Sequence, residues 1–208
     1  MKGNGARDPD RTRRRILDAA SAEFARVGLG GARVDRIAAR SGANKRMLYY
    51  YFGSKEALFL AALEESYARI RNAERELDLE HRDPREGLRR LVAFTWRYFV
   101  DNPEFMTLLN SENLHKGRHV RRSRRVREMH SPLVDTLRGI LRRGEQAGLF
   151  RAGVDPVQLY ISIAGEGYFY LSNRYTLSRI FDRDLMERRA LESRARHNAE
   201  MILNAMRR

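Results

Sequence analysis

Apolar residues recur along most of this chain at the three- and four-residue spacing of amphipathic helices. Within the segment 34–41, the positions that would share one helical face are Val34, Ile37, Ala38 and Ser41. Gly42 would end this short helix, because glycine adopts a left-handed turn without steric cost. Asn44 can cap a second short helix, whose inward face would carry Leu48 and Phe52. The pattern therefore predicts two short helices joined by a tight turn.

Prolines indicate where most of the longer helices begin. Each of the five prolines follows Asp, Asn or Ser, and such a residue can cap a helix whose first position is proline. The last four predict helix starts at Pro84, Pro103, Pro132 and Pro156. Further helices are expected over about residues 10–27, 54–76 and 185–206. No segment makes a convincing strand, so we expect an all-α protein of about nine helices.

The second short helix would present a basic and aromatic face to solvent. The residues opposite its apolar face are Lys45, Arg46 and Tyr49. A short helix with such a face is what a helix-turn-helix presents to the DNA major groove. A helical hairpin with a solvated basic face is the alternative. Two features favour DNA: the three consecutive tyrosines 49–51, and Ser54 before Lys55, where free helix amides and a cation could hold a phosphate.

The same stretch resembles the signature of the TetR family of bacterial transcriptional regulators. Residues 42–58 read G-A-N-K-R-M-L-Y-Y-Y-F-G-S-K-E-A-L, whereas the family signature typically reads G-V-S-K-G-T-L-Y-H-Y-F-x-S-K-E-x-L. The spacing, the glycine, L-Y-x-Y-F and S-K-E agree. The departures are Arg46 and Met47 in place of Gly-Thr, Tyr50 in place of His, and Arg33 where the family often has Thr. The first three change surface residues that the family uses on DNA, so they bear on the operator sequence.

The resemblance implies an N-terminal helix-turn-helix domain of three helices at residues 1–56 and a larger C-terminal helical domain at residues 57–208. The larger domain would bind an effector and dimerise, and an arm over residues 1–9 is expected to be disordered. The residues expected to contact DNA are Arg33, Asn44, Lys45, Arg46, Met47, Tyr49, Tyr50 and Lys55. In this set the second short helix would read base edges, while Arg33 and Lys55 would hold phosphates.

The positive charge is concentrated in the segment where DNA binding is expected. The net charge is +14, and residues 1–56 hold 13 Lys or Arg against 6 Asp or Glu, whereas residues 57–208 hold 28 against 21. Seven cations of the larger segment lie in the run Lys116–Arg127, which contains no anion. We interpret this run as a solvated loop or helix face and leave its role open. A basic first quarter on a balanced remainder suits a polyanion-binding module on a scaffold.

Composition and motifs argue against several other classes of protein. There are no cysteines, so neither a disulfide framework nor a thiolate metal site is possible. No apolar run approaches the roughly 20 residues of a membrane span, and the start of the chain lacks the apolar core of a signal peptide. A soluble, cytoplasmic protein is therefore expected. The sequence lacks G-x-S-x-G, the Walker-type G-x-x-x-x-G-K and a strand-linked G-x-G-x-x-G, so we expect neither enzyme activity nor a cofactor.

The helix expected from Pro156 to about Tyr175 is apolar almost all round, which predicts burial on two sides. Together with the last helix it would form a homodimer interface, as the corresponding helices do in the family. Its small residues Ala164, Gly165 and Gly167 would allow close helix approach. A central core helix of a monomer is the alternative.

A polar stripe crosses this apolar helix and indicates a candidate ligand site. Its members are Ser162, Glu166, Tyr170 and Asn173, and neighbouring helices could add Trp96, Phe99, Met106 and Asn110 as walls. Glu166 could meet an arginine across the dimer or line a ligand cavity, because an unpaired buried carboxylate is costly. For any one of the aromatic residues, a role in the plain core is the more frequent one.

A second polar group, Glu112, His115 and His119, has the i, i+3, i+7 spacing that could place imidazoles around a metal ion. Gly117 and the adjoining arginines indicate a helix end instead, and no third strong ligand is visible. No metal site is therefore predicted.

Taken together, these patterns predict a sequence-specific, DNA-binding transcriptional regulator. The expected form is a ligand-responsive repressor that binds a palindromic double-stranded operator as a homodimer and answers to an unidentified small-molecule effector. One alternative keeps DNA binding but drops the effector, as in a nucleoid-associated or protein-controlled binder. The other is a helical small-molecule- or metal-binding protein whose basic head is incidental.

Overall fold

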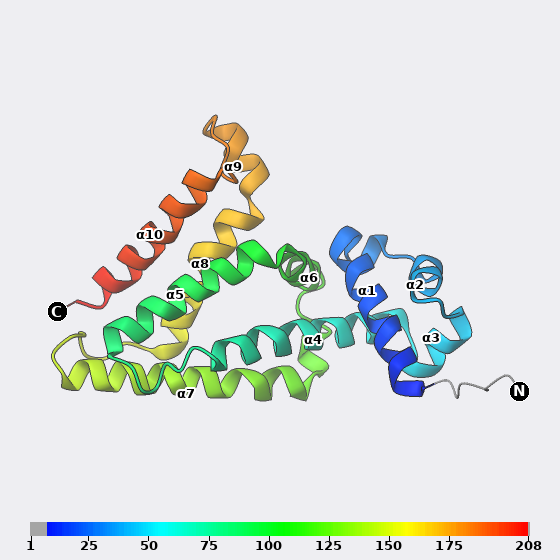
Figure 1. Ribbon diagram of the computed structural model, residues 1–208, viewed down its shortest axis with the longest axis horizontal. Helices are drawn as coiled ribbons and strands as arrows, with labels where there is room; N and C mark the ends of the chain where they lie inside the picture. Colours follow the sequence, from blue (N-terminus) through cyan, green and yellow to red (C-terminus); the bar gives the residue numbers. More distant parts are fainter. Residues whose placement is uncertain (1–7, 208) are drawn as a thin grey trace, which may run out of the picture. The chain divides into compact units, whose positions relative to one another are not determined.

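The computed structural model describes residues 8–207 of the 208-residue chain, and this part is helical without strands (Figure 1). Its elements are α1 (Pro9–Gly31), α2 (Val34–Ser41), α3 (Lys45–Phe52), α4 (Lys55–Arg75), α5 (Pro84–Asp101), α6 (Pro103–Leu114), the 3-10 helix η1 (Val120–Arg122), α7 (Arg124–Gln146), α8 (Pro156–Ser172), α9 (Arg174–Ile180) and α10 (Arg188–Ala205). The predicted all-α class is confirmed. The described residues form ten α-helices, whereas nine were predicted.

The additional helix is α9, because α8 ends earlier than predicted. The backbone amide and the side-chain amide of Asn173 both donate to the carbonyl oxygen of Phe169, at 3.1 and 2.9 Å, and so close the last turn of α8. The chain turns at Asn173 and resumes as the short α9. The last helix, α10, begins at Arg188 rather than near residue 185.

Most proline signals are confirmed, and one is wrong. Asp83 and Asp155 each accept two backbone amides at the starts of α5 and α8, as the cap-then-proline pattern predicts. Pro132, in contrast, lies inside α7. That helix begins at Arg124, where the hydroxyl oxygen of Ser123 accepts the amide of Val126 at 3.1 Å, so the cap lies well before the proline.

The start of the chain differs in part from the disordered arm expected over residues 1–9. Residues 1–7 lie outside the described part of the chain. Pro9 is the first residue of α1, and Asp8 caps this helix, because its carboxylate accepts the amides of Asp10 and Arg11. At the other end of α1, Gly28 has a φ of +66° and kinks the helix before its last turn, close to where the helix was predicted to end.

Two compact units divide the chain, and the first contains the described residues of Met1–Tyr67 together with Pro103–Val126. Its core comes from α1 to α4 and α6; the fully buried members are Ile16, Ala20, Phe24, Ile37, Leu48, Leu58, Phe59, Ala62 and Leu108. Leu108 lies on α6, so this helix shares the core of the N-terminal helices. The predicted division after residue 56 stays a prediction.

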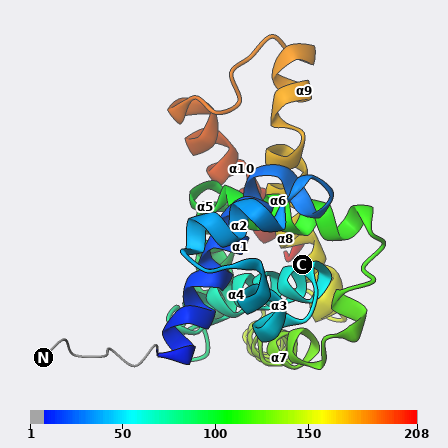
Figure 2. The same cartoon turned by 90° about the vertical axis from the view of Figure 1, so that its right-hand side faces the viewer.

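The second unit contains Ala68–Asn102 and Arg127–Arg208. Here α5, α8 and α10 pack side by side, and α9 with the segment after it connects α8 to α10 at one end (Figures 1 and 2). The buried core residues include Leu88, Leu91, Leu137, Ile140, Phe150, Leu159, Ile163 and Ile202. In the part of the chain that the structure covers, no helix is long and apolar enough to cross a membrane.

Candidate nucleic-acid interface and ligand site

The turn between α2 and α3 has the geometry that its sequence predicts. Gly42 adopts the left-handed conformation, with a φ of +62°, and its amide donates to carbonyl oxygens at the end of α2. The side-chain oxygen of Asn44 accepts the amide of Met47 at 2.9 Å and so caps α3. Leu48 and Phe52 are buried on the inner face of α3. The two short helices are therefore fixed by local caps and one small core.

The outer face of α3 is basic and aromatic. Lys45 and Arg46 are exposed, and Tyr50 is 82% exposed. The Lys45 ammonium lies 2.5 Å from the carboxylate of Asp35 on α2, in an ion pair that is itself exposed. Such a surface pair contributes little stability, so Lys45 can exchange Asp35 for another anion at small cost. The face offers cations and tyrosines to a partner.

The start of α4 has the free helix end and the cation that were predicted to hold a phosphate. The hydroxyl oxygen of Ser54 accepts the amide of Ala57 at 3.0 Å, and Lys55 is the first residue of the helix. Arg33 is exposed immediately before α2, and its side chain does not cap that helix. The positive end of the α4 dipole and these two cations favour an anion.

The arginines in the first turns of α1, in contrast, have partners within the protein. Arg13 lies over the ring of Phe52, 5.0 Å from its centroid. Arg15 donates from Nε to the carbonyl oxygen of Ser41 at 2.9 Å, which satisfies an acceptor at the end of α2. Their neighbour Arg14 lies 2.9 Å from a carboxylate oxygen of Glu65. Cations near a helix start oppose the helix dipole, and these three arginines have partners within the protein.

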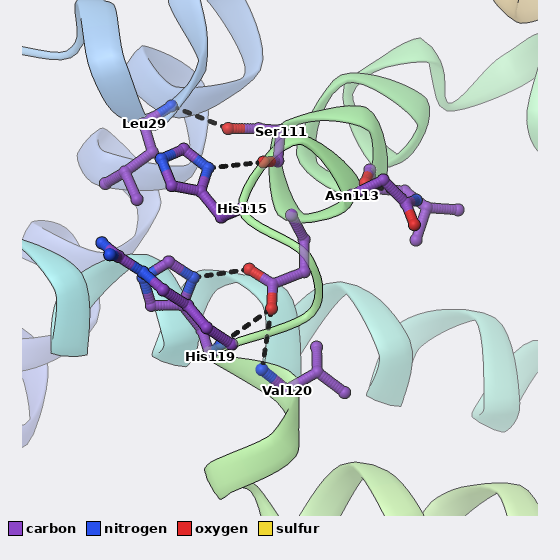
Figure 3. A network of polar contacts seen from close by, with 9 residues as sticks. Leu29, Ser111, Asn113, His115, His119 and Val120 are labelled. Carbon is purple, nitrogen blue, oxygen red and sulfur yellow. Dashed lines mark hydrogen bonds and ion pairs between the residues drawn. The ribbon is translucent and has the colours of Figure 1, made fainter.

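The polar residues at the end of α6 form a closed network (Figure 3). One oxygen of the buried Glu112 carboxylate accepts the amides of His119 and Val120 at 2.8 and 2.9 Å, and the other lies 2.6 Å from Nδ1 of His119. Nδ1 of His115 lies 2.7 Å from the carbonyl oxygen of Ser111. These side chains are thus occupied in holding the chain where α6 turns towards η1, within the first unit.

Part of the predicted ligand set is brought together in the second unit. The rings of Trp96 and Tyr170 meet edge to face, with centroids 5.4 Å apart. An oxygen of the Glu166 carboxylate lies 2.5 Å from Nη2 of Arg194, whose guanidinium also lies over the Tyr170 ring. Glu166 thus pairs with an arginine of its own chain, and the two alternatives left open for it, an arginine across a dimer or a ligand cavity, stay untested.

Phe99 belongs to the same group. It is buried, and a Cβ added to Gly167 would lie 3.1 Å from its ring and 3.5 Å from that of Trp96, so Gly167 faces the core. Ser162 and Asn173 both donate to carbonyl oxygens one turn earlier in α8. The last two members, Met106 and Asn110, belong to α6 and hence to the first unit. Binding of a ligand by this set stays a prediction.

A cavity of about 250 Å³ lies elsewhere in the second unit, beside two buried charges that sequence analysis missed. It is lined by the end of α4, the segment after it and one face of α7; among its residues, Arg71 is 3% and Glu74 is 5% exposed. The sequence places Glu74 four residues after Ile70 and so on the same face of α4, but it does not show that this face is buried.

Fold and site together define a class: a helical protein that presents a basic helix-turn-helix to nucleic acid. Residues 16–62 match the family described as bacterial regulatory proteins, tetR family, and residues 84–202 match the tetracyclin repressor-like C-terminal domain. The chain therefore belongs to the TetR family, as predicted.

Relatives agree with this assignment. The chain is 43% identical to the HTH-type transcriptional repressor NicS of Pseudomonas putida over 99% of this chain and 97% of that protein. It is 39% identical to the HTH-type transcriptional repressor SCO4008 of Streptomyces coelicolor over 54% of this chain and 55% of that protein. The prediction of a DNA-binding transcriptional regulator of the repressor type is thereby confirmed.

Solved structures share the fold at lower identity. Bacillus subtilis FadR, solved in complex with stearoyl-CoA, has a TM-score of 0.67 at 19% identity and covers 93% of this chain and 98% of its own. The ketosteroid transcriptional regulator KstR2 of Mycobacterium tuberculosis has a TM-score of 0.68 at 19% identity and covers 94% of this chain and 95% of its own.

Proposed function

We propose that this protein is a ligand-responsive repressor that binds a palindromic operator as a homodimer. The observation that carries the proposal is the exposed basic and aromatic face of α3, held by the Gly42 turn and the Asn44 cap. A helix of eight residues reaches few base pairs, so a second copy is needed for useful specificity. A pair of such helices would read two half-sites related by a two-fold axis.

The DNA-contacting residues have distinct proposed roles. On α3, the base-reading residues are Lys45, Arg46 and Met47, with Tyr49 and Tyr50 on base or phosphate. Arg33 and Lys55, at the starts of α2 and α4, hold phosphates and so set the register of the head on the duplex. Asn44 contributes chiefly by capping α3.

An exposed apolar row on α8 supports dimerisation. Val157, Ile161 and Phe169 are 44%, 54% and 61% exposed and, with Gly165, follow one another at four-residue spacing. A Cβ added at Gly165 would meet nothing within 4 Å, so this glycine lies on the open face and would let another helix approach closely. Met201 on α10 is also half exposed. Large apolar side chains in a row on a surface mark interaction sites.

The effector is proposed by analogy with solved structures of the same fold. The relatives named above include one solved with stearoyl-CoA and one named for ketosteroids, so this fold accommodates small molecules in other proteins. In this chain a ligand would act by favouring a conformation whose two α3 helices no longer match half-sites about 34–36 Å apart.

Selection of bound fragments from the source organism's sheared genomic DNA, at near-physiological salt, tests the proposal. Recovery of a palindromic motif supports it, and the neighbouring genes then suggest effectors for a thermal-shift assay. Unselective, salt-sensitive binding alone would make the head a generic phosphate binder. A palindromic motif without any small-molecule response would favour a protein-controlled DNA binder.

A further inference from the structure

The cavity in the second unit is bordered by the buried ion pair of Arg71 and Glu74, and some donor and acceptor atoms of this pair make no hydrogen bond to residues that the structure describes. Nη1 of Arg71 lies 2.9 Å from Oε2 of Glu74, one turn further along α4. Among the described residues, neither of these two atoms makes a hydrogen bond, and Nε of Arg71 has no acceptor either. The pair therefore satisfies its charges but leaves donors and an acceptor without partners.

The described residues around Arg71 hold its guanidinium in place but give Nε and Nη1 no hydrogen-bond acceptor. Nη2 donates to the hydroxyl oxygen of Tyr160 on α8 at 3.3 Å, and the guanidinium lies over the ring of that tyrosine, 5.4 Å from its centroid. The ring of His130, on α7, contacts the same tyrosine edge to face. A buried donor without an acceptor costs free energy, and natural proteins retain few of them without a reason.

The walls of the cavity restrict which molecule could supply hydrogen-bond partners to Arg71 and Glu74. The apolar part of the lining comes from Leu79, Met129, Pro132 and Leu133, and the other lining residues are charged or polar. A volume of about 250 Å³ is just below the usual range for ligand sites, which suits a molecule smaller than a typical drug. Apolar surface beside convergent polar groups is the usual form of a small-molecule site.

We propose that this cavity binds a small organic acid whose carboxylate accepts hydrogen bonds from Arg71 and whose own N–H or O–H group donates to Glu74. Guanidinium is the side-chain group best suited to a carboxylate, because its N–H donors lie in one plane and the group is always positively charged. An apolar body of the ligand lies against Met129 and Leu133. The biological meaning of this site rests on the proposed function, since the acid is then the effector, whereas its binding can be measured independently.

Matched pairs of small acids and their amides provide the probes. We would compare benzoate with benzamide, 4-hydroxybenzoate with 4-hydroxybenzamide, and hexanoate with hexanamide in thermal-shift and calorimetric titrations of the full chain. At least one acid is expected to stabilise the protein more than its amide. Arg71→Gln should weaken binding of that acid at least tenfold. Arg69→Gln is the matched control, because Arg69 is exposed on the same helix and does not line the cavity, and it should leave affinity unchanged.

Two further variants cover the case in which Arg71→Gln fails to fold. Met129→Trp fills the cavity and keeps both charges, and it should also abolish binding. Glu74→Gln should reduce the preference for 4-hydroxybenzoate over benzoate, because the acceptor for the ligand's donor is weakened. The inference is overturned if no acid is preferred to its amide, or if folded Arg71→Gln and Met129→Trp bind as the unaltered protein does.

Operator binding by the unliganded protein is recorded in parallel, so that the two proposals fail separately. Loss of operator binding with intact acid binding would contradict the proposed function alone. Intact operator binding without any preference for an acid would contradict this inference alone.

Discussion

Two buried glutamates, one in each unit, illustrate opposite ways of placing a carboxylate in a protein interior. Glu112 is 3% exposed and Glu74 is 5% exposed, so both have lost nearly all contact with water. Glu112 accepts two backbone amides and faces a histidine nitrogen. Glu74 has an arginine beside it, but its Oε2 accepts no hydrogen bond within the described part of the chain.

The difference between the two sites separates a structural role from a binding role. A buried carboxylate whose acceptors are filled fixes the backbone around it and has little left to offer a ligand. One that is paired in charge but not in hydrogen bonds lowers stability and leaves capacity for a partner. Burial raises the pKa of Glu74 to about 7, against the opposing effect of Arg71, as expected for a carboxylate that is incompletely compensated.

Removing the carboxylate of Glu112 is the severest test of this comparison. In Glu112→Leu, the amides of His119 and Val120 would be buried without an acceptor, and we expect the free energy of unfolding to fall by about 4 kcal/mol. Urea unfolding followed by circular dichroism measures this. The control is Asn113→Ala, on the adjacent exposed position of α6, with an expected change within about 0.5 kcal/mol. A loss below about 1 kcal/mol for Glu112→Leu would show that the closed network is not stabilising.

Glu74→Gln is expected to act in the opposite direction and to depend on pH. The folded-state pKa of Glu74, about 7, lies above the ordinary value of 4.5, so the protonated form favours folding. That contribution is complete below pH 4.5 and is lost as the pH rises through 7. Glutamine is neutral throughout, so at pH 8 the variant should be more stable than the unaltered protein by about 2–3 kcal/mol, with little difference at pH 4.5.

Thermal unfolding of both proteins across pH 4.5–8 checks this expectation. His81, which also lines the cavity, is present in both proteins, so its titration cancels in the difference. If the unaltered protein were instead the more stable at pH 8, the Arg71 pair would be net stabilising and the contrast with Glu112 would disappear.

The sequence predicted features that depend on residues close together in the chain. It did not predict features that depend on residues far apart in the chain. The Gly42 turn and the Asn44 cap were predictable, because both are decided by residues within four positions of each other. The helix start predicted at Pro132 was wrong, because Ser123 caps α7 well before the proline. The role of Glu112 was not predictable from its spacing to two histidines, which indicated at most a metal, since its partners are backbone amides brought near by the turn after α6.

Predicting the cavity beside Arg71 and Glu74 required knowledge that no local sequence pattern contains. Arg71 and Glu74 are ordinary helix residues in sequence, and only the packing of α7 and α8 against the end of α4 makes them buried. The predicted ligand set relied instead on the polar stripe of α8. The structure engages Glu166 with Arg194 there.

The same distinction between occupied and available groups applies on α3. Lys45 already has Asp35 beside it, whereas Arg46 is exposed next to it. We expect Arg46→Ala to remove preference at particular base pairs of the operator, worth about 1–3 kcal/mol per contact. Lys45→Ala should have the smaller effect on preference, because Asp35 competes for its charge. Selection from a randomised oligonucleotide library compares the two, and an unaltered motif for Arg46→Ala would remove that residue from base reading.

Lys55→Ala is expected to have the smallest and least selective effect. Lys55 stands at the amino end of α4, where it would neutralise one phosphate together with the helix dipole. Its loss should weaken binding to operator and unrelated DNA alike and lower the slope of log affinity against log salt by about one. Arg75→Ala removes the same charge from the last turn of the same helix and should leave that slope unchanged. If both variants changed the slope equally, net charge rather than a placed cation would explain the effect, and Lys55 would have no position of its own on the DNA.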